Sequence, residues 1–207
     1  RLAFISDREG SDNLWIADLD GANARQLSKE EQGDFLSPSW MPGGDYVLVS
    51  KATPSSGAHE IWMYHVQGGA GVQVTKSKAR PDQPRDQWLN HMGPAAYPEG
   101  KAIVFAQRRG NFNYNVTFPV WQIRQRDLVT GDEDTLTEAP GSAMRPVLSP
   151  NGRLMVYATR HDTETGLRLR DLVTGEERWL HYPVQRDDQE SVASRDTMPG
   201  YAFLPDG

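Results

Sequence analysis

The 207-residue sequence contains no cysteine, and no apolar stretch in it approaches the ~18 residues that a membrane-spanning helix needs. Basic residues are also in the minority, with 22 Lys and Arg against 28 Asp and Glu and a net charge of −6. The absence of cysteine excludes disulfides, Cys-ligated metal centres and a cysteine nucleophile. The absence of a long apolar stretch argues against a membrane span, and the small number of basic residues argues against the broad basic surface that binds nucleic acid.

Glycine, proline and aromatic residues are abundant instead. The sequence has 19 Gly and 14 Pro, spread along the chain, which predicts many turns and therefore many short strands. It also has 6 Trp, 7 Tyr and 6 Phe, whereas disordered chains are poor in aromatics. We therefore expect an ordered protein rich in β-structure.

One motif occurs four times, a short strand followed by a Pro-x-Gly type turn that ends in glycine. The four segments are residues 37–44, 93–100, 145–152 and 200–207. Their last glycines are 56, 52 and 55 residues apart, which indicates a structural repeat. Proline fixes φ at the first corner of such a turn, and glycine accepts a positive φ at the last.

Each repeat continues with three further strand-like segments. The first is a continuous apolar run, at residues 2–6, 46–50, 102–106 and 154–158. Because these runs do not alternate, we expect both of their faces to be buried. The second alternates and ends in a glycine turn, at 14–21, 61–68, 123–131 and 167–175. The third is short and polar, as suits an outer edge, at 25–28, 72–75, 134–137 and 178–180.

Four strands per repeat with short turns predict an all-β fold, a β-propeller with blades of four antiparallel strands. We expect a partial arc of about four blades, at roughly 1–28, 35–75, 92–137 and 141–180, with the first strand of a further blade at 198–207. The chain begins in a strand and ends in a turn, so we expect a piece of a longer protein. Pairing of 201–204 with 2–6 would instead close a four-bladed ring.

The repeats resemble those of the TolB-like propellers, through the Pro/Gly turns and the Asp-Leu-x-x-Gly strands. The order of certain pieces is similar to the propeller that precedes a metal-dependent amidohydrolase domain in large bacterial proteins. These pieces are 4–8, 13–18, 60–66, 71–75 and 199–203. The resemblance spans nearly the whole chain, although 41–44 and 98–100 lack the usual Ser-Pro-Asp-Gly.

This resemblance implies a non-catalytic propeller that gates substrate or mediates interactions, in a periplasmic or secreted bacterial protein. Its partners would be the missing C-terminal domain, the remaining blades and, at the channel, a peptide or protein. It implies no cofactor in this chain, and a divalent metal only in the amidohydrolase domain. Two alternatives stay open: a stand-alone TolB-type interaction propeller, and the gating propeller of a prolyl-oligopeptidase-like serine peptidase. The sequence beyond Gly207 would distinguish them.

No catalytic or metal-binding motif stands out in this chain. Its five histidines, His59, His65, His91, His161 and His181, include no His-x-His pair, and no Gly-x-Ser-x-Gly elbow occurs. Trp15 and Trp62 occupy the same place in their repeats, so we expect them to pack between blades rather than bind a ligand.

A binding site, if one exists, is expected at the mouth of the central channel, where the chain enters the first strand of each blade. The candidates there are Asp34, His91, Arg145, Arg195 and Asp196, with Ser37 and Asn90 beside them. The alternative is that these side chains only hydrate the channel.

Overall fold

The computed structural model describes residues 1–53, 57–77, 82–110, 120–161, 164–186 and 200–206. Within this part of the chain all regular structure is β, apart from one 3-10 turn, η1 (Arg85–Gln87). The described residues contain no helix of the length and apolar character needed to cross a membrane. The all-β prediction is confirmed.

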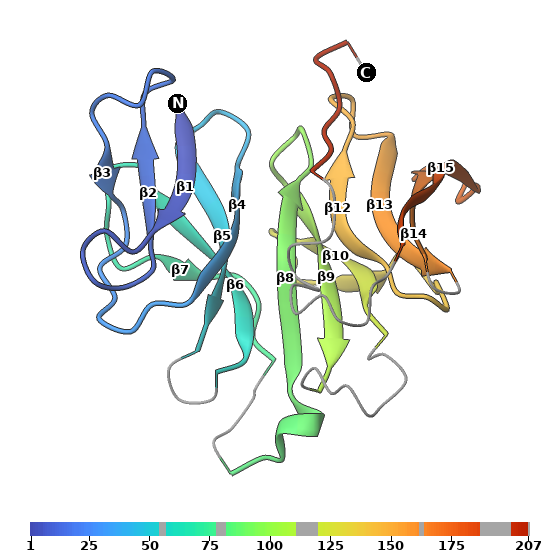
Figure 1. Ribbon diagram of the computed structural model, residues 1–207, viewed down its shortest axis with the longest axis horizontal. Coiled ribbons are helices and arrows are strands. Elements are labelled where there is room, and N and C mark those ends of the chain that lie inside the picture. Colours follow the sequence, from blue (N-terminus) through green and yellow to red (C-terminus); the bar gives the residue numbers. More distant parts are fainter. Residues whose placement is uncertain (54–56, 78–81, 111–119, 162–163, 187–199, 207) are drawn as a thin grey trace.

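The strands form four antiparallel sheets that follow one another along the chain (Figure 1). The first sheet holds β1 (Leu2–Ser6), β2 (Asn13–Ala17) and β3 (Arg25–Gln26). The second holds β4 (Phe35–Trp40), β5 (Tyr46–Ala52), β6 (His59–His65) and β7 (Val72–Gln73). The third holds β8 (Leu89–Ala96), β9 (Ala102–Arg109), β10 (Gln122–Asp127) and β11 (Glu133–Thr135). The fourth holds β12 (Met144–Leu148), β13 (Leu154–His161), β14 (Glu164–Asp171) and β15 (Glu177–Arg186).

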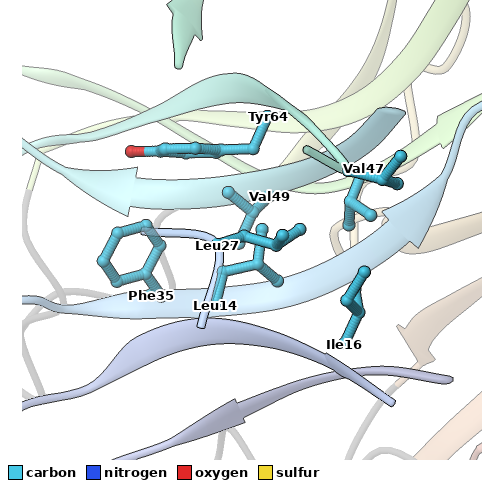
Figure 2. Packing of buried hydrophobic residues seen from close by; sticks show 8 residues of the cluster. Leu14, Ile16, Leu27, Phe35, Val47, Val49 and Tyr64 are labelled. Carbon is cyan, nitrogen blue, oxygen red and sulfur yellow. The ribbon is translucent and has the colours of Figure 1, made fainter. Parts of the chain in front are cut away.

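The apolar second strands of the second and third blades pack against the neighbouring blades through both of their faces. In β5, Val47 and Val49 belong to a core cluster shared with the first sheet, whereas Leu48 belongs to one shared with the third. Figure 2 shows the first of these clusters, where Leu14 and Tyr64 meet Val49. A third cluster joins β9 and β10 to β13. The expected two-sided burial is confirmed for the runs in β5, β9 and β13. It is wrong for β1, which is only partly buried and whose Leu2 is 44% exposed, because the described residues place no sheet on its other side.

The Asp-Leu-x-x-Gly segments fold as predicted, because the aspartate closes each turn. The Asp127 carboxylate accepts hydrogen bonds from the backbone N–H groups of Val129 and Thr130, at 2.7 and 2.8 Å. Asp171 repeats this arrangement in the fourth sheet. The hydrogen bonds from the Thr130 and Val129 amides lower the pKa of Asp127. The glycine that ends each turn, Gly131 or Gly175, has a positive φ.

The strand predictions fail at three places, one of which is the strand expected at 198–207, because the described residues 200–206 form no strand. The β2 residues do not alternate in exposure; all five are buried, and Trp15 stacks on Phe4 with Arg8 over both rings. The outer strand β15 runs to Arg186, well past the expected residue 180. Trp62 is partly buried against the cluster shared by the first and second sheets, so its assignment to packing between blades is confirmed. Trp15 is buried too, but it packs on Phe4 and Arg8 of its own blade.

The arc of blades does not close within the described residues. In the first sheet β1 is the edge strand and pairs with β2 alone, and residues 200–206 form no strand. The Tyr201 hydroxyl instead donates a hydrogen bond to the Arg145 carbonyl at 2.5 Å, which places this segment beside β12. The two ends of the chain consequently lie over different sheets (Figure 1).

Candidate functional site

The long connections of the chain share one end of the sheets. In an antiparallel blade, the connection from the second to the third strand and the connection to the next blade leave the sheet at the same end. The long connections from β5 to β6, from β7 to β8 and from β9 to β10 are all of these two kinds. The tight turns 41–45, 97–101 and 149–153 lie at the opposite end. This separation makes the loop-bearing end the one to examine for a site.

A β-bulge before a proline shapes the inner strand of three blades. Ser37, Gly93 and Arg145 each precede a proline, have positive φ values of 55°, 63° and 51°, and sit where the strand register shifts. A Cβ on Gly93 would lie 3.7 Å from the Arg145 Cα, so the bulges of the third and fourth sheets adjoin. Serine and arginine rarely adopt this conformation, and such strain gathers at functional sites.

Arg145 is the candidate that the structure places at the surface. Its side chain is exposed, at the bulge of the inner strand β12. Ser37 is exposed at the equivalent bulge of β4. The inner-strand position expected for a channel-lining residue is therefore occupied by an exposed cation in one blade and a hydroxyl in another.

Asp34 lies just before β4 and faces a histidine of the same sheet. Its carboxylate Oδ2 is 3.4 Å from Nε2 of His59, and its side chain is half exposed, whereas that of His59 is 10% exposed. The backbone carbonyl of Asp34 accepts a hydrogen bond from the Ala52 N–H. Asp34 thus reaches solvent at the loop-bearing end, while its partner is covered.

His91 and Asn90 are buried, contrary to the expectation that they line the channel mouth. The His91 ring lies between the second and third sheets, with Nδ1 2.7 Å from Glu60 Oε2 and Nε2 2.8 Å from Gln107 Nε2. Asn90 accepts a hydrogen bond from the His59 N–H and donates one to the Gly110 carbonyl. Adjacent strand residues point to opposite faces, but here the bulge at 92–95 and the neighbouring loops cover both side chains.

The hydrogen-bond partners fix the tautomer of His91. The Gln107 amide nitrogen can only donate, so Nε2 accepts and the proton sits on Nδ1, which donates toward Glu60 and Thr75. Burial on its own would raise the pKa of Glu60. The hydrogen bonds from His91, Ser77 and Thr75 outweigh it, so the pKa of Glu60 lies below its usual value.

The hydroxyl, imidazole and carboxylate of Thr75, His91 and Glu60 do not form a catalytic triad. The Thr75 hydroxyl donates to Glu60 at 2.6 Å and accepts from the Ile61 N–H at 2.9 Å, so it is not held as a nucleophile. Both ionisable side chains are only 3% exposed, which keeps substrate away from them. The described residues also contain no group of three or more His, Cys, Asp or Glu placed to hold a metal ion.

Thr75 and Glu60 belong to a polar clamp that three blades repeat and that our sequence analysis missed. In the second blade, the Thr75 hydroxyl accepts from the Ile61 N–H, and Glu60 accepts from Thr75 and from the Ser77 N–H. The equivalent trios are Asn13, Ser28 and Glu30 in the first blade, and Gln122, Thr137 and Ala139 in the third.

The sequence carries a signal for this clamp. A polar residue with an acceptor oxygen opens the third strand, and a hydroxyl residue follows 15 positions later. In the fourth blade the opening residue is Gly166, and a Cβ there would lie 2.7 Å from the rings of Trp179 and Tyr182. Without the clamp, β15 continues along β14 as far as Arg186.

Arg195 and Asp196 lie outside the described residues. Of the expected site residues, the structure therefore leaves Asp34 and Arg145 accessible at separate blades, and it buries His91. No local sequence pattern indicates that His91 lies against Glu60, because the two residues are 31 positions apart.

Comparison with known proteins identifies the family. The family model described as "TolB beta propeller domain" matches residues 1–182. The chain belongs to the TolB β-propeller family. A curated relative, the Tol-Pal system protein TolB of Anaeromyxobacter sp. (strain K), is 30% identical over 111 residues, which are 54% of this chain and 22% of the relative.

Solved TolB structures share the fold of this TolB-type chain. TolB from Acinetobacter baumannii superposes with a TM-score of 0.64 at 20% identity, covering 87% of this chain and 41% of the other. A putative TolB from Agrobacterium tumefaciens gives 0.66 at 17% identity, covering 86% and 60%. The TolB-type chain thus spans about a fifth of the curated relative and about half of these solved chains.

Proposed function

We propose that this TolB-type propeller is a non-catalytic binding module that takes a protein or peptide partner at the loop-bearing mouth of its channel. The observation that carries the proposal is Arg145, an exposed cation held at a positive φ on an inner-strand bulge. Asp34 adds a half-exposed carboxylate at the same end. The groups that could perform acid–base chemistry, His91 and Glu60, are used internally.

The family relative names a class of partner to test. It is a Tol-Pal system protein, so the partner of this chain would be another component of such a system. An exposed arginine at a bulge suits a carboxylate of the partner, because the guanidinium can donate two parallel hydrogen bonds. Arg195 and Asp196, which the sequence also assigns to the mouth, would contribute there.

The test is calorimetric titration of purified Tol-Pal components into wild-type protein, Arg145→Gln and Arg153→Gln. Arg153 is the control, since it is exposed at the opposite, tight-turn end and the substitution removes the same charge. We expect Arg145→Gln to weaken binding by about tenfold, as for a lost hydrogen bond to a charged group, and Arg153→Gln to leave it unchanged. Equal effects from both variants, or none from either, would contradict a site at the mouth.

The finer proposal is that this propeller accompanies a metal-dependent amidohydrolase domain that hydrolyses C–N bonds, in the periplasm or outside the cell. It rests on the resemblance of the pieces at 4–8, 60–66 and 199–203. The position of Tyr201 beside β12 supports a further blade after the fourth. Reading the gene past Gly207 tests this directly. A His-x-His strand would support it, and a stop codon would favour a stand-alone interaction propeller.

A further inference from the structure

One buried charge in the described part of the chain lacks a counter-charge. Arg108, near the end of β9, is 8% exposed, and its Nε is buried without a hydrogen-bond partner. Its guanidinium lies over the Trp121 ring, 4.8 Å from the centroid. Among the described residues no carboxylate forms an ion pair with it, and the adjoining segment 111–119 contains no acidic residue in the sequence.

The other buried ionisable side chains in the described residues all have a partner of opposite type. Lys51 lies 2.5 Å from Glu30, His59 lies 3.4 Å from Asp34, and His91 lies 2.7 Å from Glu60. The half-buried arginines of the third strands, β10 and β14, follow the same rule, as Arg126 and Arg170 contact a glutamate at 2.7 and 2.6 Å respectively. Arg108 departs from a pattern that the rest of the fold keeps.

An unpaired cation in this position is costly. Taking a charged group out of water without a partner is strongly unfavourable. The attraction between the guanidinium and an aromatic ring offsets only part of that desolvation free energy. Burial accordingly lowers the pKa of Arg108 to about 10. A guanidinium that stays protonated at neutral pH while mostly covered has a strong tendency to take up an anion.

The place of Arg108 suits a bound ligand. The Cα of Arg108 pairs with that of Asn90 on the inner strand β8. Trp121 is tied to the fourth blade, because its N–H donates to the Ser142 hydroxyl and its carbonyl accepts from the Ala143 N–H. The Arg108–Trp121 pair therefore lies at the loop-bearing end, where the third and fourth blades meet. The ring covers one face of the guanidinium, and its Nε is buried without a hydrogen-bond partner.

We propose that Arg108, backed by Trp121, is an oxyanion-binding site between the third and fourth blades, which takes the carboxylate or phosphate group of a small ligand. The planar fork of N–H groups matches two oxygens of either group. Binding supplies the counter-charge that the protein does not, and it ties the two blades together. The site is separate from Arg145 and does not depend on a protein partner at the channel.

The test is thermal unfolding and calorimetric titration with sodium phosphate and sodium succinate, at constant ionic strength set with sodium chloride. We expect a saturable stabilisation of the wild-type protein and of the control Arg109→Gln. Arg109 is exposed on the same strand, and its loss changes the net charge equally. Arg108→Gln should lower the affinity of the protein for the anion by at least about tenfold. Whether phosphate or succinate binds more tightly shows which of the two groups the site is built for.

Two further variants keep the proposal falsifiable. Arg108→Lys retains the charge but loses the fork, so it should fold and bind the anion about tenfold more weakly. Arg108→Met removes the unpaired charge, so in chloride alone its melting temperature should equal or exceed that of the wild type. A lower melting temperature for Arg108→Met would show that a protein group already pairs with the guanidinium. That result, or an unchanged anion response in Arg108→Gln or Arg108→Lys, would overturn the proposal.

Discussion

His91 Nδ1 lies 2.7 Å from Glu60 Oε2, across the boundary between the third and second blades, and neither side chain is more than 3% exposed. Glu60 also accepts from Thr75 and Ser77, which close the clamp of the second blade. One carboxylate therefore stabilises both a single blade and the contact between two blades. Its charge state should affect the stability of the whole arc.

Glu60→Gln should lower the free energy of unfolding at pH 7 by about 1–3 kcal/mol, because the amide cannot accept at all the positions that the carboxylate serves. The folded-state pKa of Glu60 lies below the usual 4.5, so the ionised form is the one that the fold favours. Its contribution is complete above pH 4.5 and is lost as the pH falls through the folded-state value.

Urea unfolding measured between pH 7 and pH 3 checks this prediction. The wild type should lose stability below about pH 4.5 more steeply than Glu60→Gln does. Glu176→Gln is the control, because Glu176 is exposed and its carboxylate has no recorded partner among the described residues. Parallel pH profiles for wild type and Glu60→Gln would show that the pair does not control acid stability.

The clamp gives a second prediction. Thr137→Val keeps the shape of the side chain but leaves the buried Ile123 N–H without its acceptor, and it removes one of the two donors to Gln122 Oε1. We expect the free energy of unfolding to fall by about 1–3 kcal/mol. Thr135→Val, two residues earlier at an exposed position, should cost far less. Denaturant unfolding of both variants compares them, and equal losses would mean that the clamp contributes nothing of its own.

A third prediction concerns backbone geometry. A Cβ at Gly33 would lie 1.8 Å from the Asp12 carbonyl oxygen, whereas at Gly93 the nearest atom would be 3.7 Å away and at Gly21 nothing lies within 4 Å. Gly93→Ala and Gly21→Ala therefore carry only the cost of a positive φ, about 1–2 kcal/mol. Gly33→Ala requires the backbone at Asp12 to shift, so it should destabilise the protein more than either of the other two substitutions. Melting temperatures rank the three, and a milder Gly33→Ala would contradict the close approach.

The fold was predictable because its signals are local and recur. Positions such as Val47, Val49 and Leu48 lie in one continuous apolar run, and a run buried on both faces is what a stack of sheets requires. Asp127 and Gly131 specify their turn within five residues. The pattern repeats at intervals of 56, 52 and 55 residues, so the strand assignment in each repeat supports the assignment in the others.

The site was less predictable because it depends on contacts between repeats. The location of His91 on an inner strand was inferred from the repeat, but its orientation was not. That orientation depends on the bulge at Gly93 and on Glu60 in the preceding blade. Arg108 carries no motif, and its lack of a counter-charge appears only once the surrounding residues are placed.

The last prediction is that this chain alone hydrolyses no amide or ester. Acyl transfer needs an activated nucleophile, a general base and a stabilised oxyanion at one accessible place. His91 is the best-placed base, but it already donates to Glu60 and accepts from Gln107, and it is buried. A metal-bound water would need about three fixed ligands, and the described residues offer no such group.

The assay uses dipeptide and cyclic-amide substrates with added zinc or manganese, on wild-type protein and on His91→Ala. Both proteins should show only the background rate of hydrolysis, since a buried imidazole that is hydrogen-bonded at both nitrogens cannot contact a substrate. Turnover that disappears in His91→Ala would contradict this, because it would require the ring to leave Glu60 and reach solvent. Turnover that appears only in proteins extended past Gly207 would place the chemistry in a following domain and leave the propeller as the part that binds.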